Sequence, residues 1–95
     1  MNAPKIANKD ARQYVGTLSP FRGSNLYGEA VKPGVYVCYS YGSHFPLLAH
    51  IKGEWYRNCD KYSKTTSKHK GQATPHGISF KEVSTKELTD KIYNS

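Results

Sequence analysis

The clearest strand pattern in the chain lies over residues 35–41, which read Val-Tyr-Val-Cys-Tyr-Ser-Tyr. Five of the seven are β-branched or aromatic, and both types fit the pleated surface of a β-strand. Successive side chains of a strand point to opposite faces, so the odd-numbered residues are expected on one face and the even-numbered ones on the other. The pattern therefore predicts a strand over 35–41.

A hairpin is expected immediately afterwards. Apolar and aromatic residues recur over 45–51 and 54–59, and only Lys52-Gly53 separates the two segments. A two-residue connection that ends in glycine is typical of a tight β-hairpin, because such turns need positive φ angles. With this loop, Ile51 faces Glu54 and His50 faces Trp55 across the pair. Residues 35–59 are thus predicted to form a three-stranded antiparallel meander.

Weaker patterns flank this meander. Short strands are expected over 13–18, 26–31 and 78–83, each lying next to Pro or Gly residues that favour turns. Residues 1–11 are polar and show no period, so they predict a flexible N-terminal tail. Residues 12–95 are then a single domain, because a chain of this length has no room for a second core.

Two short helices are predicted toward the C-terminus. A Ser-x-x-Glu capping box begins at Ser84, and Leu88 and Ile92 give the helix that follows, about 85–93, an apolar stripe. Another helix is expected over about 63–70, where hydroxyl side chains can cap the start, lysines lie near the end and a glycine follows. The sequence therefore predicts a small α+β domain with a mostly antiparallel sheet.

The chain carries an excess of positive charge. Fourteen Lys and Arg residues oppose seven Asp and Glu residues, which gives a formal charge of +7 and a pI near 9.5. Such a field favours nucleic acid, an anionic membrane or an acidic protein as a partner, although lysines kept for solubility give the same composition. No apolar run approaches the roughly 20 residues that span a bilayer, and the N-terminus lacks the apolar stretch of a signal peptide. We expect an intracellular protein that does not enter membranes, with Cys38 and Cys59 as free thiols.

Much of this charge lies in one segment. Residues 60–72 contain four lysines, one histidine and five hydroxyl side chains, and no carboxylate follows Asp60 until Glu82. Many donors close together suit the oxygens of a phosphate backbone. The residues predicted to bind nucleic acid are Arg57, Lys61, Ser63, Lys64, Thr65, Thr66, Lys68, His69 and Lys70. The alternative is that the hydroxyls only cap a helix and the lysines are solvated.

Aromatic side chains lie just upstream of this segment. Because the bases of single strands stack on aromatic rings, the candidate stacking residues are Tyr39, Tyr41, Trp55 and Tyr56. In so small a domain, aromatic residues on strands also build the core. One face of a strand must be buried, so not all four can serve as platforms for bases.

Metal binding and catalysis have little support. The order Cys38, His44, His50, Cys59 lacks the short paired spacing of structural zinc sites. No glycine-rich elbow and no third member accompany a Cys–His pair, so nucleophilic catalysis is not indicated. We therefore expect neither a metal nor a cofactor, and a protein that is not an enzyme.

Two stretches resemble a group of small uncharacterised proteins encoded by tailed bacteriophages. The matching residues are Tyr39-Ser40-Tyr41 and the nonapeptide Lys61-Tyr62-Ser63-Lys64-Thr65-Thr66-Ser67-Lys68-His69. The resemblance covers 35 to about 74 and brings no known activity. It implies a phage-encoded protein that works in the cytoplasm of a bacterial host.

Phage accessory proteins commonly bind nucleic acid or disable a host protein, an association that rests on origin and not on physics. Together with the basic segment, it leads us to expect a non-catalytic accessory protein that binds DNA or RNA through residues 60–72. The alternative is a phage-encoded inhibitor whose basic face meets an acidic surface of a host protein. The sequence leaves the oligomeric state open.

Overall fold

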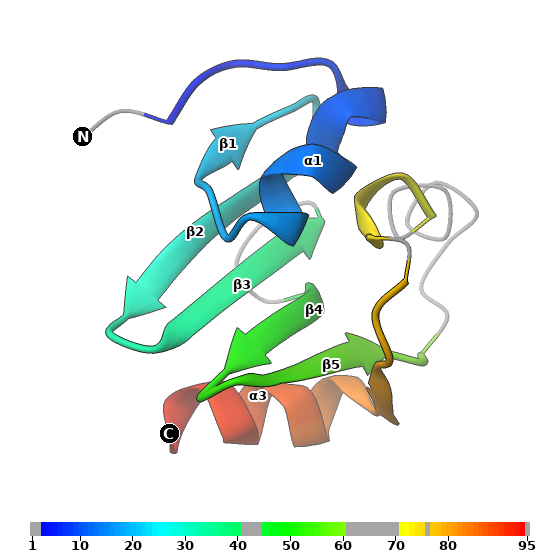
Figure 1. Ribbon diagram of the computed structural model, residues 1–95. Coiled ribbons are helices and arrows are strands. Elements are labelled where there is room, and N and C mark those ends of the chain that lie inside the picture. The colour runs from blue at the N-terminus through cyan, green and yellow to red at the C-terminus, as the bar shows by residue number, and fades with distance from the viewer. Residues whose placement is uncertain (1–2, 41–44, 61–70, 76, 95) are drawn as a thin grey trace.

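The computed structural model describes residues 3–40, 45–60, 71–75 and 77–94. Six strands form one sheet in chain order, and neighbours are antiparallel except for β5 and β6, which are parallel (Figure 1). The elements are the 3-10 helix η1 (Asn8–Asp10), α1 (Ala11–Gly16), β1 (Phe21–Arg22), β2 (Leu26–Lys32), β3 (Val35–Ser40), β4 (Pro46–Ile51), β5 (Glu54–Asn58), β6 (Lys81–Val83) and α3 (Thr85–Tyr93). The expected α+β class with a mostly antiparallel sheet is confirmed.

The central meander has the predicted register. Ile51 pairs with Glu54 and His50 with Trp55 across β4 and β5. The turn residues Lys52 and Gly53 have φ angles of 49° and 86°, as a two-residue hairpin with two left-handed positions requires. The hairpin therefore follows from the local sequence alone.

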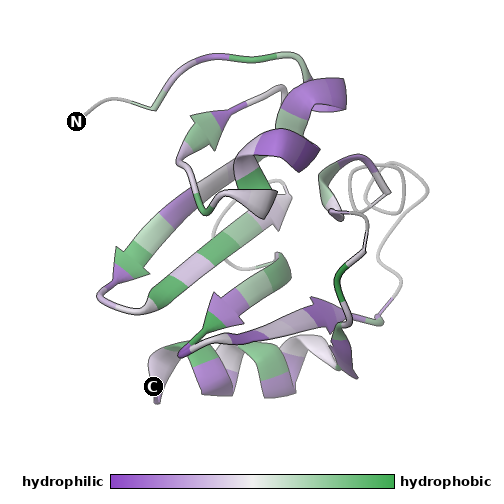
Figure 2. Cartoon of the chain, in the orientation of Figure 1, coloured by the Kyte–Doolittle hydropathy of each residue, from purple (hydrophilic) through white to green (hydrophobic). Residues whose placement is uncertain are grey.

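The sheet is buried on both faces at its centre. All six residues of β3 are buried. Tyr36 and Cys38 join a core with Phe21 and α1 on one face, and the odd-numbered residues of β3 join a second core with Leu88 and Ile92 of α3 on the other. Hydrophobic positions recur along β3 and β4, whereas β5 is largely hydrophilic (Figure 2). Helices on both faces explain why β3 carries apolar or aromatic residues on both of its sides, with Ser40 as the one polar member.

The N-terminal region differs from the expectation. Residues 11–16 form α1, so the strand predicted over 13–18 is wrong. Ala11 and Val15 are fully buried one helical turn apart, a spacing that a short apolar run does not reveal. Residues 4–6 pair with β1, where the Arg22 N–H donates to the Pro4 carbonyl and the Ile6 N–H to the Arg22 carbonyl, both at 2.8 Å. These contacts place residues 4–11 in the fold, whereas the sequence suggested a loose tail.

The C-terminal helix has the predicted cap. The Glu87 N–H donates to Ser84 Oγ at 3.1 Å, and α3 runs from Thr85 to Tyr93. The preceding strand, β6, is shorter than the expected 78–83. The helix expected over about 63–70 lies outside the described residues, and residues 71–73, which follow it, are helical.

Candidate nucleic-acid interface

The structure describes some of the predicted binding residues and leaves others outside its range. Those outside the described residues are Tyr41, Lys61, Ser63, Lys64, Thr65, Thr66, Lys68, His69 and Lys70. Arg57, Tyr39, Trp55 and Tyr56 are described, and so are Asp60 and Gly71, which flank residues 61–70. The candidate site is therefore described from the contacts of these two flanking residues and from the surface of β5.

The upstream anchor is a network at the end of β5. Asn58 is 1% exposed, and its Nδ2 donates to the Pro46 carbonyl and to Thr85 Oγ1, both at 2.8 Å. Its Oδ1 accepts from the Asp60 N–H at 2.8 Å. Asp60 Oδ2 in turn accepts from the Thr85 N–H at 2.8 Å, and this bond lowers the pKa of the Asp60 carboxyl. The basic segment thus begins at a point fixed to both β4 and the start of α3.

The downstream anchor is held by α1. Arg12 Nη2 donates to the Gly71 carbonyl at 2.8 Å, and its Nε donates to the Thr74 carbonyl at 2.9 Å. Ala73, between these two contacts, and Pro75, directly after them, are buried. The sequence did not single out Arg12, which lies between the expected tail over 1–11 and the expected strand over 13–18.

Three ring side chains lie in a row beside Trp55 of β5, and we call them the aromatic row: His50 of β4, Trp55, and Phe80, which precedes β6. The ring of Trp55 meets His50 edge-on with centroids 4.7 Å apart, and it meets Phe80 at 5.5 Å. Trp55 and Phe80 are partly buried against the first core. The hairpin register gives the contact between His50 and Trp55, whereas Phe80 reaches the row only through the parallel pairing of β6. The row is a half-exposed surface with three connected rings.

Arg57 lies at the end of the aromatic row with a carboxylate partner. Its Cζ is 5.6 Å from the centroid of Phe80. Its Nη2 and Nε donate to the Glu82 carboxylate at 2.8 and 3.1 Å, and these bonds raise the pKa of the guanidinium. The fork geometry is the preferred pairing of arginine with a carboxylate. The charge of Arg57 is therefore largely balanced by Glu82 within the fold. The sequence had suggested a cation that is free to bind phosphate.

Tyr39 belongs to the core. It is 6% exposed and its ring stacks on Tyr27 at a centroid distance of 5.2 Å. Burial raises its pKa to about 12. The expectation of Tyr39 as a stacking platform is wrong for this fold, because no ligand can reach a ring that the sheet and α3 cover.

Tyr56 lies on the face of β5 opposite to Trp55. Its hydroxyl donates to Glu54 Oε2 at 2.8 Å, and Glu54 also pairs with Lys81 at 2.9 Å. Lys91 Nζ is 5.0 Å from the centroid of the Tyr56 ring. Trp55 and Tyr56 therefore cannot stack on the same stretch of one bound strand.

The charges are unevenly distributed along the chain. All seven carboxylates fall within the described residues, whereas residues 61–70 contain four lysines and no carboxylate. That segment accounts for four of the seven excess positive charges. At least four carboxylates already have partners in the fold, those of Glu54, Asp60, Glu82 and Glu87.

The fold defines a small α+β protein in which helices cover both faces of a six-stranded sheet. Comparison with protein families, with characterised proteins and with solved structures finds no match for this chain. Among the described residues, no helix is long and apolar enough to cross a membrane, and no three His, Cys, Asp or Glu side chains gather as metal ligands would.

Proposed function

We propose that this protein is a non-catalytic phage accessory protein that binds nucleic acid through residues 60–72. The observation that carries the proposal is the charge of this segment, which has four lysines and no carboxylate after Asp60. Both of its ends are tied to the folded domain, by Asp60 to α3 and by Arg12 to Gly71. A cationic segment held at two points binds a phosphate backbone at a lower entropic cost than a free tail.

The aromatic row supports a contribution from stacking. Trp55 and Phe80 are packed on the core from one side and remain partly exposed on the other. Bases stack on such rings with little regard for sequence, and each contact is worth about 1–3 kcal/mol. Trp55, the central ring of the row, is three residues from Asn58 on β5, the strand that leads into the basic segment. We therefore expect single strands to bind more tightly than duplexes.

The test is a fluorescence anisotropy titration with single-stranded and duplex DNA and RNA over a series of salt concentrations. The wild-type protein should bind at low salt and lose affinity steeply as salt rises, because lysines release counterions from phosphates. Replacing Lys64 and Lys68 by Gln should lower the log–log salt slope on duplex DNA by roughly one to two units. The matched control replaces the exposed Lys9 and Lys86 by Gln, removes the same charge elsewhere, and should leave the slope nearly unchanged.

A Trp55→Leu variant separates stacking from charge. It should fold and lose about tenfold or more in affinity for single strands, with its salt slope preserved. Absence of binding to any of the four nucleic acids at low salt contradicts the proposal. An unchanged salt slope in the double Gln variant also contradicts it.

A host protein with an acidic surface is the second candidate partner, and one observation favours it. A groove of about 460 Å³ at the ends of the two central hairpins is lined by Lys32, Lys52 and Leu18, and Leu18 is 39% exposed. Pulldown from a bacterial lysate with and without nuclease distinguishes the two. A single stoichiometric protein that is retained after nuclease treatment would support the inhibitor.

A further inference from the structure

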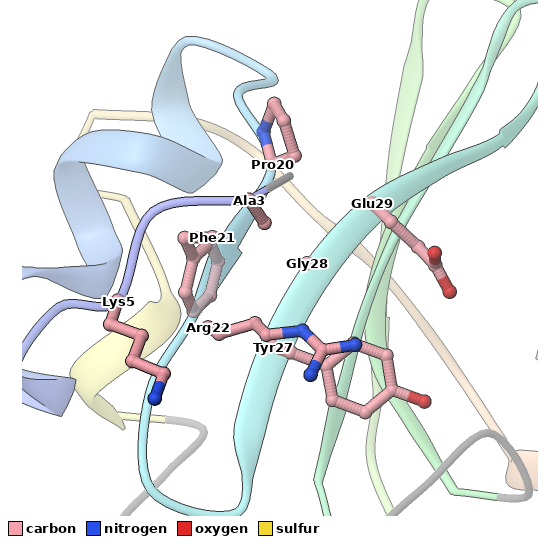
Figure 3. Close-up of a pocket in the computed structure, with 8 residues that line it drawn as sticks. All are labelled: Ala3, Lys5, Pro20, Phe21, Arg22, Tyr27, Gly28 and Glu29. Carbon is pink, nitrogen blue, oxygen red and sulfur yellow. The ribbon is translucent and has the colours of Figure 1, made fainter. Parts of the chain in front are cut away.

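A second cationic site lies at the edge of the sheet formed by β1 and β2. The N-terminal residues, β1 and β2 enclose a cavity of about 700 Å³ there (Figure 3). This volume is within the range of small-molecule sites, which is about 300–1,000 Å³. Its lining residues are Ala3, Lys5, Pro20, Phe21, Arg22, Tyr27, Gly28 and Glu29.

Two cationic residues line this cavity. Lys5 forms a parallel bridge with Arg22, and backbone hydrogen bonds of 2.8 Å on either side hold the two segments together. Both side chains are exposed. The ion pairs within the described part of the chain join Arg57 to Glu82 and Lys81 to Glu54, and neither involves Lys5 or Arg22. Both charges are therefore available to an anionic ligand.

An aromatic ring lies beside these cations. Tyr27 is the cross-strand partner of Arg22, and Figure 3 shows the Arg22 side chain extending alongside the Tyr27 ring. One face of the ring stacks on Tyr39, with centroids 5.2 Å apart and planes at 29°. Because Tyr39 is buried, Tyr27 is a half-exposed ring with a rigid support. Such a ring is suited to stack on a flat ligand.

A carboxylate completes the lining. Glu29 follows Tyr27 on the same face of β2, and in Figure 3 its side chain points away from Lys5. Gly28 lies between them in β2 and adds backbone atoms to the lining. The cavity therefore offers positive charge, an aromatic surface and a hydrogen-bond acceptor in different places.

From this arrangement we propose that the cavity binds a nucleoside phosphate. Arg22 and Lys5 bind the phosphate, the base stacks on Tyr27, and Glu29 accepts a hydrogen bond from a sugar hydroxyl or an amino group of the base. The site uses no residue of the basic segment, so it extends beyond the proposed function. The same chemistry is presented by a free mononucleotide and by the phosphorylated end of a strand.

The test is an NMR titration of the ¹⁵N-labelled full chain with adenosine 5′-monophosphate, using adenosine and inorganic phosphate as matched probes. The nucleotide should shift the backbone amides of residues 21–29 and bind at least about tenfold more tightly than either probe, because each probe lacks half of the contacts. The Arg22→Gln variant should bind the nucleotide about tenfold more weakly, and Lys5→Gln should show a smaller loss. Lys9→Gln, on the same N-terminal segment but outside the cavity, is the control and should bind like the wild type.

Three results would overturn the proposal: no shifts at millimolar nucleotide, adenosine binding as tightly as the nucleotide, or Arg22→Gln binding like the wild type in a folded protein. A 5′-phosphorylated trinucleotide distinguishes the two sources. Tighter binding of the trinucleotide indicates the end of a strand, and tighter binding of the mononucleotide indicates the free ligand. The variant with Gln at Lys64 and Lys68 should keep full nucleotide affinity, so this inference and the proposed function fail separately.

Discussion

Gly28 lies where two aromatic side chains approach the backbone of β2. A Cβ at this position would be 2.7 Å from Phe21 Cε1 and would collide with the hydroxyl of Tyr36. Neither neighbour can easily move, because Phe21 is fully buried and the Tyr36 hydroxyl donates to the Ser19 carbonyl at 2.7 Å. Glycine usually weakens a strand, but here it permits the close approach.

Replacing Gly28 by Ala should therefore destabilise the protein. Overpacking a well-filled core typically costs about 1–3 kcal/mol, and chemical denaturation measures the difference in the free energy of unfolding. Gly71→Ala is the control, because an added Cβ there meets nothing within 4 Å and residues 71–73 are helical. That variant should be as stable as the wild type or slightly more stable. A Gly28→Ala variant as stable as the wild type would contradict the close approach of Phe21 and Tyr36 to the backbone of β2.

At the scale of elements, the junction of β5 and α3 depends on two polar side chains. Asn58 and Asp60 belong to β5 and its continuation, and both bind Thr85 at the start of α3. A carboxylate there also interacts favourably with the positive end of the helix dipole. This junction fixes where the basic segment leaves the domain.

The Asp60 carboxylate predicts a pH dependence of stability. The Thr85 N–H lowers its pKa in the folded state, so its contribution is present above the unfolded value and is lost as the pH falls through the folded value. Stability should therefore decline below about pH 4. Asp60→Asn can accept the same hydrogen bond but does not titrate, so its unfolding free energy should depend less on pH between about 2 and 5. Identical pH profiles for the two proteins would exclude this role of Asp60, since Glu54, which also has a lowered pKa, is present in both.

At the scale of the whole molecule, the two cysteines differ in burial, and therefore in how their thiols are expected to react. Both are free, but Cys38 is fully buried in the first core and Cys59 is exposed. The expectation of two free thiols agrees with this geometry. Burial also raises the pKa of the Cys38 thiol, which suppresses the reactive thiolate.

A thiol reagent at neutral pH should therefore modify one cysteine rapidly and the other slowly. Cys59 should react at the rate that is typical of an exposed thiol. Cys38 should react only when the sheet opens, and its rate should rise with denaturant in parallel with global unfolding. Cys59→Ser is the control, because it should remove only the fast phase. Two fast phases in the native wild-type protein would contradict a buried Cys38.

The sequence could predict those contacts of the candidate site that depend on residues close together in the chain. The hairpin register placed His50 against Trp55, because a two-residue turn fixes which residues face each other. Arg57, by contrast, meets Glu82 and Phe80 only because β6 joins the edge of β5 in parallel. No local pattern reports a contact between residues 25 positions apart, so the pairing that balances the charge of Arg57 could not be foreseen.

The sequence by itself determined the meander over 35–59, the capped helix at the C-terminus and the concentration of charge in 61–70. Each depends on neighbours in the chain: strand alternation, turn conformation and a helix cap act over a few residues. Only the tertiary structure decided that 11–16 is a helix, that Tyr39 is buried on a sheet covered on both faces, and that Lys5 and Arg22 share a cavity. These features depend on contacts between distant segments, where the gain from burying apolar surface outweighs weak local preferences.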